Sequence, residues 1–253
     1  MSFLQHLEAL RWHLIRSAIA ISGFAVLAFL NKGFVFDTIL LGPKNPDFLT
    51  YRVMCSISEV ICITELPFIL MNISMSGQFT NHIFVSAIAG FIIAFPYVFW
   101  EIWRFVKPAL YNKESKHARG VVFFSSLLFM SGILFGYYVI APLAVNFLGS
   151  YQVSELVANQ INLSSYITTV ASISFACGVV FELPIITYFL TKVGILTPEF
   201  MKTYRKHALV ITLILSAIIT PPDVISQVLV AMPLLLLYEV SIVVSRIVIK
   251  KQQ

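Results

Sequence analysis

Long apolar segments separated by short polar stretches are the feature that most limits how this chain can fold. A helix needs about 20 residues to cross the roughly 30 Å of hydrocarbon in a bilayer, and several segments reach or approach that length. They lie at about 14–36, 83–102, 121–141, 166–190, 207–220 and 224–244. The sequence therefore predicts an all-α polytopic membrane protein with six transmembrane helices. They form a single integral membrane domain over residues 1–253.

The composition agrees with a protein that folds in lipid. Of the 253 residues, 58% are hydrophobic and only 11% are charged, with a mean hydropathy of +0.89. Soluble domains are about one quarter charged, so this chain cannot hide its apolar surface by folding in water. The fifth and sixth segments are short, and only Pro-Pro-Asp separates them, which predicts a tight hairpin.

Lysine and arginine are distributed unevenly between the two sides of the predicted spans. Cytoplasmic loops of membrane proteins are enriched in these residues. On one side lie only Lys32, near the end of the first segment, and Lys44 and Arg52, in the loop after it. The other 14 of the 17 lie on the opposite side, at or near the termini and the loops after the second and fourth segments. Both termini are therefore predicted to be cytoplasmic. The net charge of +5 reflects this topology rather than nucleic-acid binding.

The residues before the first span are predicted to form a cytoplasmic amphipathic helix, 1–13. Phe3, Leu4, Leu7 and Leu10 recur at helical spacing and form one apolar stripe. Polar and charged residues reach into the second turn, so the N-terminus lacks the pattern of a cleavable signal peptide.

The loop at 37–81 is predicted to form short helices over the outer face. Its two cysteines, Cys55 and Cys62, form a disulfide if the loop lies outside the cytoplasm, and otherwise remain free thiols. Cys177 is interpreted as a small core residue. The sequence has no CxxC pair and no His/Cys cluster with metal-ligand spacing, so we expect no metal and no cofactor.

Glu182 lies inside the fourth apolar segment, about 12 Å deep by helical rise. An ionisable residue there costs about 2.5–3.5 kcal/mol on insertion scales. Three explanations stay open: a protonated side chain, a water-filled concavity, or a polar partner on another chain. Pro184 removes a backbone donor and is expected to bend the span. A bent span with a polar inner face favours a concave surface over a compact bundle.

Further polar residues lie near the ends of the spans. Asp223 is interpreted as a helix N-cap, and Thr220 and Gln227 are candidates to bind a polar residue of a partner helix. Glu239 is expected to reach the membrane interface. Glu101 and Arg104 are expected to pair at the inner interface.

Glu8 and Glu114 are candidates for an acidic spot within a basic cytoplasmic face. Such a spot would attract a basic ligand, and an arginine is the natural counterpart of a carboxylate. No nucleophile–base pair or nucleotide-binding motif is present, so the chain is not predicted to be an enzyme.

Four motifs, in order along the chain, resemble those of the TatC family, the multi-spanning receptor subunits of the twin-arginine protein translocase. They are HLEALRWHL (6–14), FPYVFWEIWRFVKPALYNKES (95–115), FELP (181–184) and TPPDVISQ (220–227). The resemblance covers essentially the whole chain, and the ordered set is specific. It implies six spans, an N-in/C-in orientation and a glove-shaped molecule with a concave face.

The resemblance also implies roles for individual residues. Arg11, Phe105 and Glu114 would recognise a signal peptide with two consecutive arginines, and Glu114 would accept those arginines. The family pattern HLxELR has a glutamate where this chain has Ala9. Glu8 lies about 100° around the helix from that position, so we expect Glu114 to carry more of the recognition, with help from Glu8.

The other implied roles lie deeper in the chain. Pro43 would be a structural residue of the first outer loop, and Glu182 would lie on the concave face. The residues that would dock the small single-span partners are Thr220, Asp223 and Gln227.

The resemblance implies a receptor subunit of an oligomeric complex in the cytoplasmic (inner) membrane. With TatA-like and TatB-like single-span subunits, it would export folded cargo carrying twin-arginine signal peptides, using the proton-motive force. The alternative is a proton-coupled small-solute or ion transporter that uses Glu182. The sequence shows no inverted repeat and no pair of broken helices that would favour such a transporter.

Overall fold

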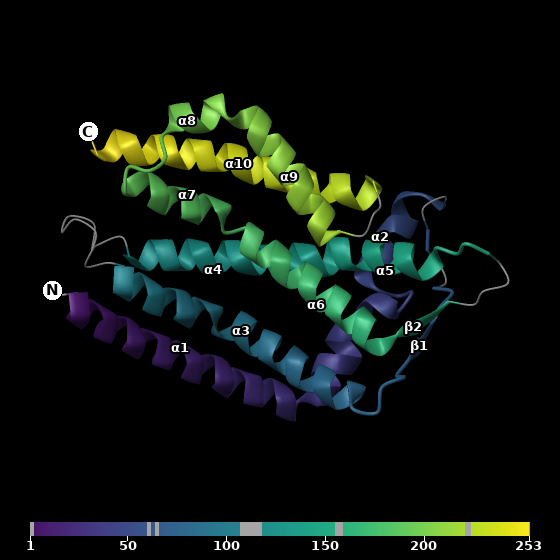
Figure 1. The fold of residues 1–253 in the computed structure, drawn as a ribbon. Coiled ribbons are helices and arrows are strands. Elements are labelled where there is room, and N and C mark those ends of the chain that lie inside the picture. Colours follow the sequence, from purple (N-terminus) through teal and green to yellow (C-terminus); the bar gives the residue numbers. More distant parts are fainter. Residues whose placement is uncertain are drawn as a thin grey trace.

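Long helices run side by side through the molecule (Figure 1). The computed structural model describes residues 3–59, 62–63, 66–106, 118–154, 159–220 and 224–252. The longest helices in these ranges are α1 (Phe3–Leu30), α3 (Gly77–Val106), α4 (Ala118–Phe135), α6 (Leu163–Val180) and α10 (Val224–Gln252). α1 packs along α3, α3 contacts α4 and α6, and α10 packs against α7 (Leu183–Lys192). The helical architecture predicted from the sequence is confirmed.

The two ends of the molecule differ. Both chain termini lie at one end, together with α8 (Pro198–Thr203), the C-terminal end of α3 and the N-terminal end of α4 (Figure 1). The other end carries α2 (Leu49–Ile57) and the two short strands. We call these the inner end and the outer end.

Five helical stretches in the described ranges are long and apolar enough to cross a membrane. They are Leu7–Leu30, Gly77–Phe105, Gly120–Ser150, Leu163–Lys192 and Gln227–Lys250. α9 (Arg205–Ile219) has only 15 residues, fewer than the roughly 20 of a full crossing. The count of six spans therefore stays a prediction. The position of both termini at one end supports it, because an even number of crossings returns the chain to its starting side.

The N-terminal helix and the first span form one continuous helix. Residues of the predicted helix 1–13 and of the predicted span 14–36 belong to one helix, because α1 runs unbroken from Phe3 to Leu30, and the cytoplasmic location of residues 1–13 stays a prediction. No glycine or proline lies near the predicted boundary to end the helix. The first span also ends earlier than predicted, and a separate π-helix at Phe34–Leu40 follows it.

The third span is longer than its predicted end at residue 141. After α4, the chain continues through a π-helical turn (Gly136–Ile140) into α5 (Ala141–Ser150). Pro142 lies in the first turn of α5, where its missing N–H costs little. Pro142, one residue beyond the predicted end of the span, is therefore accommodated inside the span.

The fourth span is broken where the sequence predicts a bend. α6 ends at Val180 and α7 starts at Leu183, with Glu182 at the N-cap position of α7 and Pro184 in its first turn. The proline both starts the second helix and prevents an unbroken one.

The first outer loop folds into short elements, as predicted, but also into a strand that was not predicted. After the π-helix come a 3-10 turn (Gly42–Lys44) and α2. β1 (Ile69–Met71) then pairs in parallel with β2 (Gln160–Asn162), with Leu70 opposite Ile161. A disulfide joins Cys55 to Cys62 in this loop, which resolves the alternative left open by the sequence.

Glycines allow α4 and α6 to approach closely. A Cβ atom on Gly132 would lie 2.6 Å from the carbonyl oxygen of Cys177, and one on Gly136 would lie 2.8 Å from the Cα of Ser174. Two small residues spaced four apart along one helix let a second helix approach closely, which is common in membrane proteins. This contact fixes α6, and with it the break that carries Glu182, against α4.

Candidate functional site

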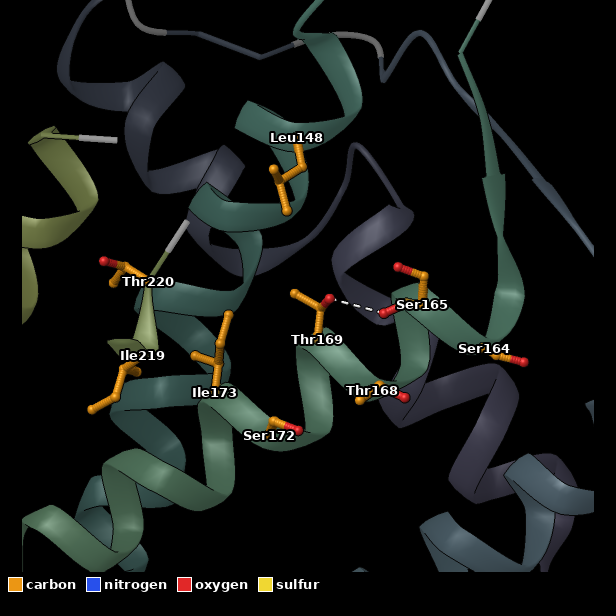
Figure 2. Close-up of a pocket in the computed structure, with 9 residues that line it drawn as sticks. All are labelled: Leu148, Ser164, Ser165, Thr168, Thr169, Ser172, Ile173, Ile219 and Thr220. Atoms are coloured by element: carbon orange, nitrogen blue, oxygen red, sulfur yellow. Dashed lines mark hydrogen bonds between the residues drawn. The ribbon is translucent and has the colours of Figure 1, made fainter. Parts of the chain in front are cut away.

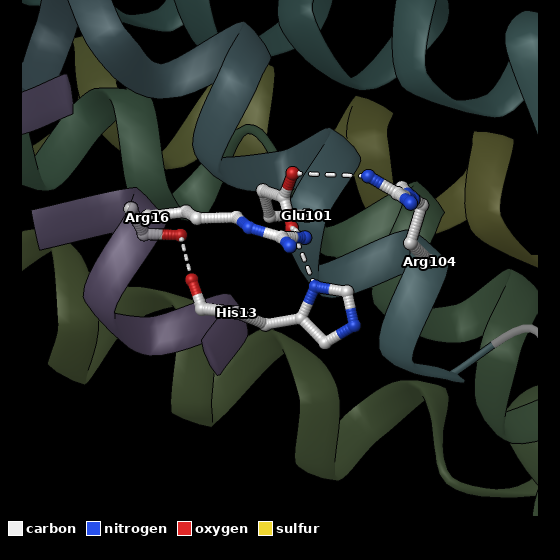
Figure 3. Close-up of polar contacts among 5 residues, drawn as sticks. His13, Arg16, Glu101 and Arg104 are labelled. Atoms are coloured by element: carbon white, nitrogen blue, oxygen red, sulfur yellow. Dashed lines mark hydrogen bonds and ion pairs between the residues drawn. The ribbon is translucent and has the colours of Figure 1, made fainter. Parts of the chain in front are cut away.

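A buried carboxylate joins α1 to α3 near the inner end (Figure 3). Glu101 of α3 is only 1% exposed, and its Oε2 lies 2.5 Å from Nδ1 of His13 and 3.9 Å from Nη1 of Arg16, both on α1. Its Oε1 accepts a hydrogen bond of 3.3 Å from Arg104 on the next turn of α3. We call these four residues the Glu101 cluster.

The predicted pairing of Glu101 with Arg104 is present, but the contribution of α1 was missed. The sequence shows the charges of His13 and Arg16, yet nothing in it shows which face of α1 meets α3. Arg104 also lies over the ring of Trp100, 5.0 Å from its centroid, in a cation–π contact.

Of the predicted recognition residues that the structure describes, Phe105 contacts the Glu101 cluster, and Glu8 and Arg11 lie on the turns of α1 before His13. Glu8 and Arg11 are exposed on the first turns of α1. Phe105 is half-buried at the end of α3, and its ring meets that of His13 edge-on at 6.1 Å. Glu114 lies outside the described residues. The chain segments that flank it, the end of α3 and the start of α4, lie at the inner end with the N-terminus (Figure 1).

Glu182 is buried between helices rather than open to a concavity. Its side chain is 8% exposed, and its Oε2 accepts a hydrogen bond of 2.8 Å from Ser125 of α4. This corrects the expectation that the carboxylate faces a hollow, because the break between α6 and α7 directs it toward α4. Its Oε1 is buried without a hydrogen-bond partner among the described residues. A buried carboxylate with a hydrogen bond to only one of its two oxygens is uncommon in native structures and calls for a structural or functional explanation.

A pocket lined by hydroxyl groups opens beside α6 (Figure 2). It has a volume of about 540 Å³, and Thr220 lies on its rim. Its lining residues are Leu148, Ser164, Ser165, Thr168, Thr169, Ser172, Ile173, Ile219 and Thr220. The sequence carries this signal as SSYITTVAS (164–172), in which the hydroxyl residues recur on one helical face. The sequence analysis did not use that pattern.

The predicted docking residues lie partly in this pocket and partly between α9 and α10. Thr220 donates a hydrogen bond of 2.8 Å to the carbonyl of Ser216, and Gln227 donates one of 3.3 Å to the carbonyl of Leu213. Ser216 in turn donates to the carbonyl of Gln227. Gln227 thus ties α10 back to α9 while staying partly exposed. Asp223 lies outside the described residues.

Glu239 has a partner that the sequence analysis did not foresee. Its Oε2 lies 2.6 Å from Nη2 of Arg205 across α9 and α10, and both side chains are about half exposed, at 54% and 52%. It therefore reaches solvent, as expected, but as half of an ion pair.

Pro43 is fully buried at the outer end, as expected of a structural residue. The hydroxyl of Tyr51 lies 2.9 Å from the carbonyl oxygen of Pro43 and 3.0 Å from that of Pro142, and donates to them. Burial raises the pKa of Tyr51, so this donor stays protonated. Tyr137 and Tyr166 likewise donate to the carbonyls of Ile39 and Leu40. Tyrosine hydroxyls thus fasten the outer loop to the spans.

Among the described residues, no group of three or more His, Cys, Asp or Glu side chains could hold a metal ion.

Comparison with known proteins connects these sites to one family. The model of the family described as Sec-independent protein translocase protein (TatC) matches residues 5–233. The TatC proteins of Blattabacterium sp. subsp. Periplaneta americana and Aquifex aeolicus are each 38% identical over 100% of this chain, and over 97% and 98% of their own lengths. A crystal structure of the twin arginine translocase receptor TatC is similar with a TM-score of 0.73 and 37% identity, covering 96% of this chain and 99% of that chain.

Proposed function

Because this chain belongs to the TatC family of Sec-independent protein translocases, we propose that it is the receptor subunit that binds twin-arginine signal peptides. Family membership makes it a multi-pass membrane protein, a component of a translocase that works within a complex, and a transport protein rather than an enzyme. The proposal adds the ligand, the partners and the energy source.

One observation carries the proposal: nearly the whole chain is similar in sequence and in structure to a solved twin arginine translocase receptor. The similarity covers 96% of this chain and 99% of that chain. A shared fold alone would support only an analogy, but 37% identity over this length supports a shared ligand as well.

The chemistry of the inner end suits an arginine-rich ligand. A carboxylate binds a guanidinium through two parallel hydrogen bonds, which a lysine ammonium cannot reproduce. Glu8 and Arg11 are exposed near the start of α1, and Phe105, at the end of α3, contacts His13 of α1. We infer that Glu114, with help from Glu8, accepts the two arginines of the signal peptide.

The remaining parts of the proposal concern assembly. TatA-like and TatB-like single-span subunits would dock a polar residue near Thr220, Asp223 and Gln227. The complex would lie in the cytoplasmic membrane and export folded cargo with the proton-motive force. The alternative of a proton-coupled solute transporter gains no support from the family to which the chain belongs.

A binding measurement tests the proposal. The purified chain in lipid nanodiscs is titrated with a fluorescent signal peptide that carries two arginines, and with the same peptide carrying two lysines. We expect the arginine peptide to bind about tenfold more tightly or better. Glu114→Gln should remove most of this preference, whereas Asp47→Asn, at an exposed outer-loop carboxylate, should leave it intact. Equal affinity for the two peptides would contradict the proposal.

A further inference from the structure

The Glu101 cluster connects the two helices that carry the proposed recognition residues. We propose that Glu101 is a positioning residue for signal-peptide recognition. It holds the inner part of α1 against the end of α3, so that the exposed residues on both helices face the ligand in a fixed arrangement. This inference rests on the proposed function and deepens it.

The geometry excludes Glu101 as a direct ligand of the peptide. The side chain is 1% exposed, and both of its oxygens are already engaged, Oε2 by α1 and Oε1 by α3. An incoming guanidinium would have to displace these contacts. The carboxylate therefore acts through the groups it holds.

His13 transmits the position of Glu101 to the recognition surface. Its Nδ1 binds Glu101, while its ring packs edge-on against Phe105, one helical turn after Glu101 on α3. Arg11 lies two residues before His13 on α1, about 200° around the helix, so its exposed side chain projects from the side of α1 away from α3 and its place is set by the backbone of α1. A shift of α3 along α1 would therefore move Phe105 relative to Arg11. It would also move the end of α3, Val106, from which the chain leads toward Glu114.

The charges explain why a carboxylate is needed at this contact. Arg16 approaches from α1 and Arg104 from α3, and Glu101 is the acid that both share. Without its negative charge, Arg16 on α1 and Arg104 on α3, each about half exposed, would lose the buried acid that pairs with both, and only their mutual repulsion, screened by solvent, would remain between the two helices. The inner ends of α1 and α3 should then separate.

The decisive variant is Glu101→Gln in the full-length chain, because glutamine keeps the size of the side chain and removes its charge. The nanodisc titration with arginine and lysine peptides is repeated on this variant. We expect the arginine peptide to bind about fivefold more weakly and the preference over the lysine peptide to shrink. Spin labels at the exposed positions Trp12 and Ile102 should report a longer and broader distance between α1 and α3.

A matched control exists in the same chain. Glu239→Gln removes the acid of another ion pair between two helices, that of Arg205 with Glu239 on α9 and α10. It should leave both affinities unchanged. If Glu101→Gln fails to accumulate, His13→Ala cuts the link from the α1 side only and should produce a smaller shift in the same direction.

The outcomes separate the two proposals. A wild-type chain without preference for arginine would overturn the proposed function. A wild-type preference that survives Glu101→Gln unchanged would overturn the positioning role alone. An equal loss of affinity for both peptides would also overturn it, because that result indicates general damage to the fold.

Discussion

Two buried glutamates show how differently a membrane protein can satisfy a carboxylate. Glu101 is surrounded by three basic side chains and has contacts on both oxygens. Glu182 has one hydroxyl partner, Ser125, and an oxygen without a hydrogen bond among the described residues. Since burying a charge is favourable only with good partners, Glu101 suits a structural contact. Glu182 costs stability and suits a contact that forms with another molecule.

Replacing Glu182 should therefore separate stability from transport. Glu182→Ala removes a half-satisfied buried carboxylate, so we expect membrane levels of the chain to stay the same or rise. If Glu182 forms the proposed contact with another molecule, export of a folded reporter with a twin-arginine signal should fall several-fold in this variant. Reporter transport and chain levels are measured in the same cells. Wild-type export would remove Glu182 from the mechanism.

At the outer end, Tyr51 gives a prediction about stability alone. Tyr51→Phe keeps the ring but leaves the buried carbonyls of Pro43 and Pro142 without this donor. The loss should cost about 1–3 kcal/mol of unfolding free energy, measured by thermal or denaturant unfolding in detergent. Tyr151→Phe, at a residue 64% exposed, is the control and should change little. Equal stability of the two variants would show that the Tyr51 hydroxyl does not fasten the loop.

At the scale of elements, the apolar segments predicted which parts are helical but not where helices join. The break at Glu182 followed from Pro184, whereas Pro142 proved to lie inside a span because a π-helical turn precedes it. The pairing of β1 with β2 joins segments about 90 residues apart, and two three-residue strands leave no periodic signal. Contacts between helices, such as that of His13 with Glu101, depend on how each helix is rotated about its axis, and this rotation could not be predicted from a single sequence.

The close packing of α4 on α6 is testable by adding a single methyl group. Gly132→Ala would place a Cβ 2.6 Å from the Cys177 carbonyl oxygen, which forces the two helices apart. We expect a loss of about 1–3 kcal/mol, although alanine in an open helical position is favourable. Gly23→Ala in α1, where nothing lies within 4 Å, should be neutral or stabilising. Unfolding of both variants in detergent decides the matter, and a stable Gly132→Ala chain would contradict this packing.

For the whole molecule, charge and disulfide chemistry point to the same orientation. Both ends of the chain lie at the inner end, on the side that the lysine and arginine bias predicts to be cytoplasmic, and the Cys55–Cys62 disulfide lies in the loop predicted to be outside. Disulfides persist in oxidising compartments. The orientation stays a prediction from the lysine and arginine bias. The disulfide could not be predicted, since its formation depends on that orientation and on the fold of the loop.

Labelling with a membrane-impermeant maleimide checks this orientation. In spheroplasts, Cys55 and Cys62 should react only after reduction, and the buried Cys177 should stay unreactive. A cysteine introduced by Val193→Cys, at an exposed inner position after α7, should react only once the membrane is opened. Reaction of that cysteine in intact spheroplasts would show that the inner end faces outward and would contradict the predicted orientation.

Crosslinking of a bound signal peptide shows where on the chain the two arginines are recognised. A photoreactive residue is introduced in the chain at Glu8, Phe105 or Glu114, and in a control at Ile218, which is 75% exposed near the end of α9. We expect adducts with the twin-arginine peptide from Glu8, Phe105 and Glu114, and none from Ile218. These adducts should be lost when the peptide carries two lysines. Adducts that ignore the arginines, or that form only from Ile218, would contradict recognition at the inner ends of α1 and α3.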